Sequence, residues 1–348
     1  MHDAKFLKHI AKPCLAKLVR LSLLLPLLAV VFSTATGFSQ ALSWATAERD
    51  TTTPMGGESQ RPGAGAVVWN GSLWVAYLDA TTIDTEGDAS IFTASNSGGT
   101  TFGNKHQVTV TGGQTVVSAN NPALAVFNNL LYLVYTDGFG NTQFLHTSDG
   151  VNWGADLGLV TTGITGSPSL AVFGPNLFVG LLNKSKVTLT LASIAENNTV
   201  TVENYPSITL NFNPGLAVFN NTLFIATETN ADSHDIIYYT STDGLTLSSA
   251  NTGAASDQTS TAPTLAVFNN VLYLGFRSND SSDNFLYKFT TDGTTWSSSI
   301  EPHIGIGGNP LLVAATTLSG PDNNRIFMLF ASESSPDFFL CSTSAPIP

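Results

Sequence analysis

The sequence predicts an all-β fold built from repeated antiparallel units, and three observations lead to this prediction. One hairpin pattern recurs along the chain: an apolar run such as Ala123–Phe127, a two-residue turn, and a second apolar run such as Leu131–Tyr135. Apolar runs joined by two residues are typical of β-hairpins. A proline precedes each copy, and the prolines are spaced by 60, 46, 46, 49 and 47 residues. Charged residues make up only 11% of the 348 residues, which suits short strands and many polar turns.

The repeat length indicates the architecture. A period of about 40–50 residues with strand-like content is typical of the blades of a β-propeller. The six copies start near Pro62, Pro122, Pro168, Pro214, Pro263 and Pro310. We therefore expect a six-bladed β-propeller that forms one domain over residues 42–348.

Each repeat divides into four strands, A to D. In the second copy, strand A covers Ala123–Phe127, strand B Leu131–Tyr135 and strand C Thr142–Thr147, while strand D begins near Trp153. The copy that starts at Pro263 divides in the same way. The pattern predicts four-stranded antiparallel blades.

The last copy lacks a strand of its own. It offers Leu311–Thr316, Arg325–Ala331 and Phe338–Ser342, and then the chain ends. An unpaired edge is a liability that sheet proteins avoid. The segment Leu42–Ala47 contains Trp44, which precedes the first repeat much as a tryptophan precedes other repeats. We expect this N-terminal strand to join the last blade and close the ring.

The first 41 residues have the pattern of a secretory signal peptide. Five basic residues precede an apolar run, Leu21–Phe32, which small residues follow. The run is short for a membrane span, which needs roughly 20 apolar residues. We place cleavage after Ser39-Gln40-Ala41, with Ser33-Thr34-Ala35 as a second possible site; a retained membrane anchor is the alternative. The protein is therefore expected to be secreted, extracellular or periplasmic, with no membrane span after cleavage.

Charge and cysteine content narrow the classes of partner. The formal net charge is −12, and it becomes about −16 once residues 1–41 are removed. Such a charge disfavours nucleic acid and anionic membranes as partners. Of the two cysteines, Cys14 lies in the predicted signal peptide, and Cys341 is expected to be a small buried hydrophobe. We expect a soluble monomer without disulfides.

A second motif recurs between strands C and D. It occurs as Thr147–Trp153, Ser241–Leu247 and Thr290–Trp296, each with Asp-Gly at its centre, and in altered form as Ser95–Phe102. Asp-Gly is a tight-turn dipeptide, and its carboxylate can accept hydrogen bonds from the backbone of its own turn. The third repeat lacks the motif.

This motif resembles the Asp box of sialidase-type propellers, Ser-x-Asp-x-Gly-x-Thr-Trp. The first copy has the spacing of that box but carries Ser97 in place of the Asp, and the other copies keep the Asp but are one residue shorter. In that family the box is a structural turn on the face away from the active site. The resemblance therefore implies the fold and says little about chemistry.

Any site is expected on the face that carries the B–C and D–A connections, which we call the loop face. The opposite face, the turn face, carries the uniform Asn-Asn and Asp-Gly turns. Variable loops on a rigid scaffold are where binding residues gather. The alternative interpretation is that most polar residues of these loops are simply solvated. The candidate binding residues are Arg61, Asp79, Asp84, Glu86, Asp137, Glu228, Asp235, Arg277 and Asp280.

A sialidase-like glycosidase is one function to weigh. The resemblance implies three arginines around a carboxylate, a Tyr–Glu nucleophile pair and an acidic Asp. Only Arg61 and Arg277 can reach the loop face, and two arginines do not make that cluster. Another two-carboxylate glycosidase is conceivable, with candidates Asp79, Asp84, Glu86 and Glu228.

Two functions without catalysis compete with it. We favour a ligand-binding propeller that binds carbohydrate, because Asn and Asp occur in nearly every B–C loop and Phe139 offers an aromatic ring there. Repeated weak sites would gain from avidity. A structural or protein-interaction role at the cell surface is the alternative, and it predicts no site.

No cofactor is predicted. Asp84, Glu86 and Asp88 alternate oxygen ligands, so calcium is the one metal to consider, but the run does not match an EF-hand loop. The histidines are scattered without zinc-site spacing. An ordinary acidic loop is the preferred interpretation.

Overall fold

Strands pair into six antiparallel sheets in the residues that the computed structural model describes: 42–45, 48–54, 65–84, 87–98, 102–154, 158–185, 187–229, 233–252, 257–320, 323–331 and 337–343. The predicted signal peptide (residues 1–41), Arg61 and Glu86 lie outside these residues. The described residues from 43 onward belong to one compact unit. No helix among them is long and apolar enough to cross a membrane.

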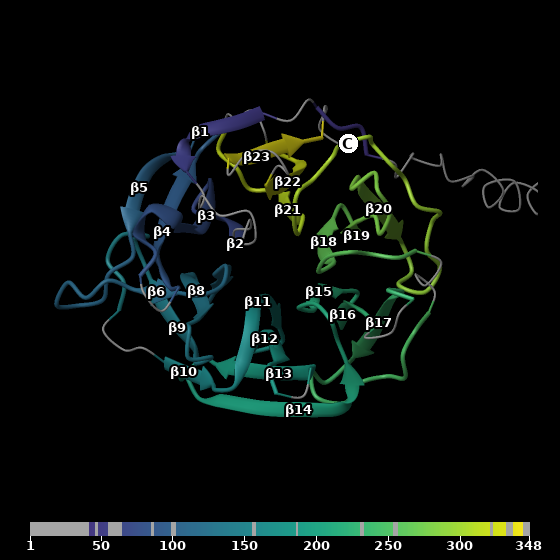
Figure 1. The fold of residues 1–348 in the computed structure, drawn as a ribbon, viewed down its shortest axis with the longest axis horizontal. Coiled ribbons are helices and arrows are strands. Elements are labelled where there is room, and N and C mark those ends of the chain that lie inside the picture. Colours follow the sequence, from purple (N-terminus) through teal and green to yellow (C-terminus); the bar gives the residue numbers. More distant parts are fainter. Residues whose placement is uncertain are drawn as a thin grey trace, which may run out of the picture. The chain divides into compact units, whose positions relative to one another are not determined.

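We number the sheets by repeat (Figure 1). Sheet 1 contains β2 (Gly65–Trp69), β3 (Ser72–Asp79), β4 (Ala89–Asn96), β5 (Gly103–Gln107) and the short β6 (Val117–Ser118). Sheet 2 contains β7 (Ala123–Phe127), β8 (Leu130–Thr136), β9 (Thr142–Thr147) and β10 (Gly158–Thr161). Sheet 3 contains β11 (Ile164–Phe173), β12 (Asn176–Asn183), β13 (Thr188–Ala195) and β14 (Val200–Thr209).

The remaining sheets are smaller or mixed in origin. Sheet 4 contains β15 (Gly215–Phe219), β16 (Thr222–Glu228) and β17 (Ile236–Ser241). Sheet 5 contains β18 (Thr264–Phe268), β19 (Val271–Arg277) and β20 (Phe285–Thr290). Sheet 6 contains β21 (Leu311–Ala315), β22 (Arg325–Ala331), β23 (Asp337–Ser342) and the N-terminal β1 (Glu48–Pro54). One 3-10 turn, η1, covers Ala80–Thr82.

The repeated hairpins form as the sequence predicted. Asn128 and Asn129 both have positive φ, 51° and 63°, and they connect the paired residues Phe127 and Leu130. Positive φ at both central residues defines the turn whose twist matches antiparallel strands, and asparagine tolerates that conformation. Asn-Asn or Asn-Gly turns with the same sign of φ occur in sheets 1, 4 and 5.

The outermost strands are less regular than predicted. Sheets 4 and 5 each have three strands, and isolated bridges such as Tyr238–Asn251 and Tyr287–Ile300 stand where a fourth would run. Serine side chains replace part of the ladder there: the hydroxyl of Ser248 accepts from Thr240 N at 3.0 Å. The prediction of a fourth strand beginning at Trp296 was therefore wrong. Side-chain hydrogen bonds compete there with regular backbone pairing.

The N-terminal segment lies in sheet 6, where β1 pairs antiparallel with β23. Trp44 also bridges to Thr343, and the amide of Ala45 donates to Ser342 O at 2.8 Å. The regular part of this strand comes later than the predicted 42–47. Cys341 is buried, as predicted, and burial raises the pKa of its thiol to about 12.

The core lies between neighbouring sheets. The inner strands contact one another in chain order, from β2 and β7 through β18 and β21, and β21 also contacts β2. A cluster of buried apolar side chains joins consecutive sheets, for example Trp74 and Leu78 of sheet 1 with Leu133 and Tyr135 of sheet 2. Each inner strand is thus covered on both faces, which explains why its sequence is an unbroken apolar run.

The Asp-Gly turns fasten one sheet to the one before it. Asp149 Oδ1 accepts from Val151 N at 2.9 Å and from Asn152 N at 2.8 Å. Gly150 has φ 80°, and a Cβ on it would lie 2.1 Å from the ring of Trp74 in sheet 1. The glycine is required because an aromatic ring of the previous sheet lies directly against it.

Candidate binding site at the centre of the loop face

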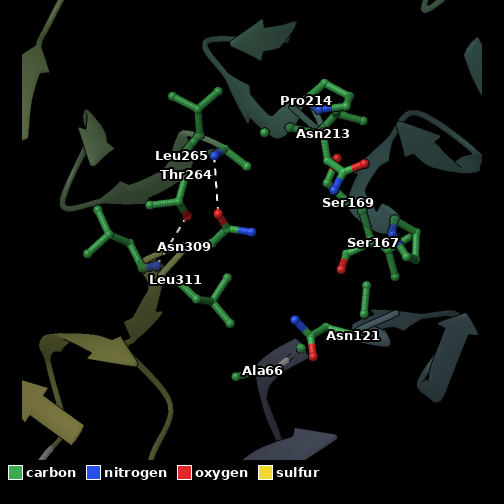
Figure 2. Close-up of a pocket in the computed structure, with 18 of the residues that line it drawn as sticks. Ala66, Asn121, Ser167, Ser169, Asn213, Pro214, Thr264, Leu265, Asn309 and Leu311 are labelled. Carbon is green, nitrogen blue, oxygen red and sulfur yellow. Dashed lines mark hydrogen bonds between the residues drawn. The ribbon is translucent and has the colours of Figure 1, made fainter. Parts of the chain in front are cut away.

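The inner strands begin around a cavity of about 190 Å³. Figure 2 shows the labelled side chains that surround it. A proline immediately precedes four of the inner strands and lies inside the fifth, β11. Each of these prolines and the residue before it line the cavity: Asn121-Pro122, Ser167-Pro168, Asn213-Pro214, Ala262-Pro263 and Asn309-Pro310. The volume is below the range typical of drug-sized ligands, about 300–1,000 Å³. It therefore suits a small molecule or one end of a larger one.

Amides and hydroxyls supply the polar part of the cavity. Asn309 Oδ1 accepts from Ala262 N at 3.2 Å, which fixes the side chain and leaves its Nδ2 directed to the cavity (Figure 2). Thr264 Oγ1 accepts from Leu312 N at 3.2 Å. The buried hydroxyl of Ser169 has no hydrogen-bond partner among the described residues. The cavity thus presents hydrogen-bonding groups held in place by the ends of the strands.

The cavity is electrically neutral and apolar at its base. Among the described residues, none of those that line it carries a charge. Leucines from five strands lie below the polar mouth: Leu124, Leu170, Leu216, Leu265 and Leu312. Four of them also line a second cavity of about 440 Å³, whose other side chains are apolar except for Thr316 and Thr317. A neutral ligand with hydroxyls at one end and apolar atoms at the other matches this arrangement.

Three of the predicted acidic residues cap their own loops. Asp79 is buried and accepts from Thr81 N and from Lys105 Nζ, each at 3.0 Å. Burial alone would raise the pKa of Asp79, but the hydrogen bonds from Thr81 and Lys105 outweigh it and lower that pKa. Asp137 accepts from Phe139 N at 3.0 Å and Asn141 N at 2.8 Å.

Asp280 has the same role in the fifth repeat. It accepts from Ser282 N and from the hydroxyl of Ser278, both at 2.9 Å. Hydrogen bonds from these serines lower its pKa. Asp84 is exposed and accepts from Asp88 N at 2.8 Å, while Asp235 takes part in a backbone bridge with Gln258.

Arg277 and Glu228 have specific partners. Arg277 Nη2 lies 2.5 Å from Asp283 Oδ1, so its charge is neutralised within its own repeat. The side chain of Glu228 is fully buried and lies 2.5 Å from His234 Nδ1. None of the described candidates lines the central cavity; each lies at the B–C loop of its own sheet. Whether they bind a ligand stays a prediction.

The cavity residues were missed from the sequence, although a signal existed. The residue before the repeated proline is Asn in three repeats and Ser in a fourth. Asn and Ser side chains are uncharged, whereas the predicted candidates were all charged residues. Phe139, noted for its aromatic ring, is 79% exposed. Among the described residues, no group of three His, Cys, Asp or Glu side chains is placed to hold a metal ion.

No protein-family model matches the chain, and no curated protein matches it in sequence. Solved structures are similar in fold. AofleA from Arthrobotrys oligospora has 12% identity and a TM-score of 0.57, over 85% of this chain and 86% of that one. A variant of the Aleuria aurantia lectin in complex with α-methyl-L-fucoside has 10% identity and a TM-score of 0.53, over 81% and 91%.

The sialidase Hz136, from a Hadza microbial source, has 11% identity and a TM-score of 0.53 over 81% of this chain and 65% of its own. At such identities the likeness shows the fold alone. Together with the six antiparallel sheets, it places this protein among the β-propellers, a class that includes both a lectin and a sialidase among these neighbours.

Proposed function

We propose that this protein is a secreted, six-bladed β-propeller that binds carbohydrate at the centre of its loop face. The six sheets are its blades, and the contact of β21 with β2, together with the pairing of β1 and β23, supports a closed ring. Closure by pairing removes the free edge of the last blade.

One observation carries the binding proposal: the central cavity is neutral and is lined by amides and hydroxyls from several repeats. Sugar hydroxyls both donate and accept hydrogen bonds, and Asn and Ser side chains can do the same. A carboxylated sugar fits less well, because no described cation lines the cavity.

The fold similarity supports the same class of ligand. The Aleuria aurantia lectin variant is in complex with α-methyl-L-fucoside, and the sialidase neighbour also bears a name from carbohydrate chemistry. Export is supported by the basic and apolar N-terminal pattern. The N-terminal sequence of protein recovered from the culture medium tests export, and an intact residue 1 there would contradict cleavage.

A glycan array followed by calorimetry with the best ligand tests binding. Replacing Asn121 and Asn213 together by Ala should weaken binding by about thirtyfold, since each lost hydrogen bond costs roughly 1 kcal/mol. Asn197→Ala, in a turn on the opposite face, is the matched control and should leave affinity unchanged. Absence of binding on the array would favour the protein-interaction role. Hydrolysis of a chromogenic glycoside would show that the protein is a glycosidase and not only a carbohydrate-binding protein.

A further inference from the structure

Glu228 and His234 form a pair at the base of the B–C loop of sheet 4. Glu228 ends β16 and has no exposed side-chain surface. Its Oε1 accepts from Asn211 Nδ2 at 3.2 Å and lies 2.5 Å from His234 Nδ1. Its Oε2 makes no hydrogen bond with the described residues. A buried carboxylate is costly unless it is well bonded, so this pair is not explained by stability.

The backbone of His234 adopts the left-handed conformation, with φ 53°. Asp283 in sheet 5 and Val187 in sheet 3 have φ of 50° and 52° at the corresponding place. Thr259 N donates to the carbonyl oxygen of His234 at 3.1 Å and fixes this geometry. The conformation thus belongs to the repeated loop, and it sets where the His234 side chain leaves the backbone.

Equivalent positions in other repeats show how unusual the pair is. His234 stands two residues before Ile236, which pairs with Glu228 across the strands. In sheet 2 Thr136 pairs with Thr142, so the corresponding positions are Thr136 and Gly140. In sheet 5 they are Arg277 and Asp283, which neutralise each other, and Asp283 also has a positive φ of 50°. Among sheets 2, 4 and 5, only sheet 4 has an imidazole at this position.

The pairing fixes which ring nitrogen faces solvent. If Nδ1–H donates to the Glu228 carboxylate, Nε2 carries the lone pair. The His234 side chain is 36% exposed, and its Nε2 makes no hydrogen bond with the described residues. We infer that Nε2 of His234 accepts a hydrogen bond from a ligand hydroxyl, which makes Glu228 and His234 a second polyol subsite on the loop face.

The subsite lies next to the central cavity along the chain. Asn211, which bonds Glu228, is two residues before Asn213, which lines the cavity. A ligand of more than one sugar unit could contact both. The inference rests on the proposed function for its choice of probes, while the state of the imidazole can be tested without any ligand.

Nitrogen NMR of the full chain with labelled histidine tests the imidazole directly. His234 should hold its proton on Nδ1. His303 is a matched control, since its Nδ1 lies 3.2 Å from Glu301 Oε1 but its side chain is 83% exposed; it should show no fixed tautomer. In Glu228→Gln the preference of His234 should be lost. A proton on Nε2 of His234 in the unaltered protein would overturn the inference.

Titration with methyl glycosides of fucose, galactose and mannose tests the subsite. The Nε2 resonance of His234 should move, and His234→Phe should weaken binding by about fivefold, as expected for one hydrogen bond, while His303→Phe should not. Thermal melts check that each variant folds. If Asn213 variants weaken binding and His234 neither shifts nor contributes, the subsite is wrong and the proposed function stands. If His234 responds and the cavity variants do not, the central cavity is not the site.

Discussion

The turn face and the loop face are ends of the same strands, but they differ in how their polar groups are satisfied. On the turn face, asparagines at positive φ and Asp-Gly turns recur with the same bonds in several repeats. On the loop face, the ends of the sheets carry different polar pairs: two threonine hydroxyls in sheet 2, an imidazole–carboxylate pair in sheet 4 and a guanidinium–carboxylate pair in sheet 5. The contrast teaches that repetition preserves the turns, while the polar groups of the loop face differ from one repeat to the next.

The largest effect is expected from removing the pairing of the chain's two ends. Deleting residues 43–54 removes β1 and leaves the edge of β23 unpaired. Free edges recruit other chains, so the variant should aggregate or fail to accumulate as a folded monomer. Light scattering and circular dichroism measure this. A monomeric, fully folded variant would show that the ring does not need β1.

The next effect tests the turn face. Gly150→Ala should lower the free energy of unfolding by about 2–4 kcal/mol, since it adds a Cβ at positive φ against a buried ring. Gly163→Ala is the matched control: φ is 74°, but nothing lies within 4 Å of the added Cβ. Its loss should be about 1 kcal/mol. Equal losses in urea unfolding would mean that the contact with Trp74 does not matter.

A smaller effect is expected from a drastic change on the loop face. Glu228→Leu introduces the residue that sheet 3 carries at the equivalent position, Leu182, which is buried. Replacing a buried ion pair by well-packed apolar side chains is often neutral or stabilising, whereas removing one partner is costly when the other stays buried; here His234, the partner left behind, is 36% exposed. The free energy of unfolding should change by less than about 1 kcal/mol. A loss near that of Gly150→Ala would show that Glu228 serves the fold, and the contrast between the faces would fail.

The smallest effect is expected on the stability of the protein at acidic pH. Hydrogen bonds from Asn152 to Asp149, and from the turn amides to Asp243 and Asp292, hold the pKa of each carboxyl well below 3.8. A folded-state pKa below the unfolded one means stability that is present above about pH 4 and is lost as the pH falls further. Replacing the three by Asn should flatten the acid limb of the thermal melting curve. An unchanged limb would place acid sensitivity elsewhere.

The hairpins could be predicted because their cause is local. Asn128 and Asn129 supply the left-handed turn, and the apolar runs beside them supply the register. The Asp-Gly turns were local in the same way. The contact that requires Gly150, in contrast, comes from Trp74 in the previous repeat, and no sequence pattern joins these two positions.

The candidate site was harder to predict from the sequence than the hairpins, and the reason is physical. Whether Asp79 binds a ligand or caps a turn depends on where Thr81 N and Lys105 point, which only the folded backbone decides. The sequence also did not show that Asn121, Asn213 and Asn309 line one cavity. They are far apart in the chain and come together only where the inner strands begin. Among the described binding candidates, Glu228 has a buried carboxylate oxygen that makes no hydrogen bond with the described residues.

The pairing of β1 with β23 sets the order in which the protein can be completed. The hydrogen bond between Ala45 and Ser342 joins segments from opposite ends of the chain. The earliest strand to be synthesised must therefore wait, unpaired, until the last has emerged. Contacts so distant in sequence slow folding, because the loop must close before the contact stabilises it. A protein completed in this way stays incompletely paired until almost the whole of the described chain has been made.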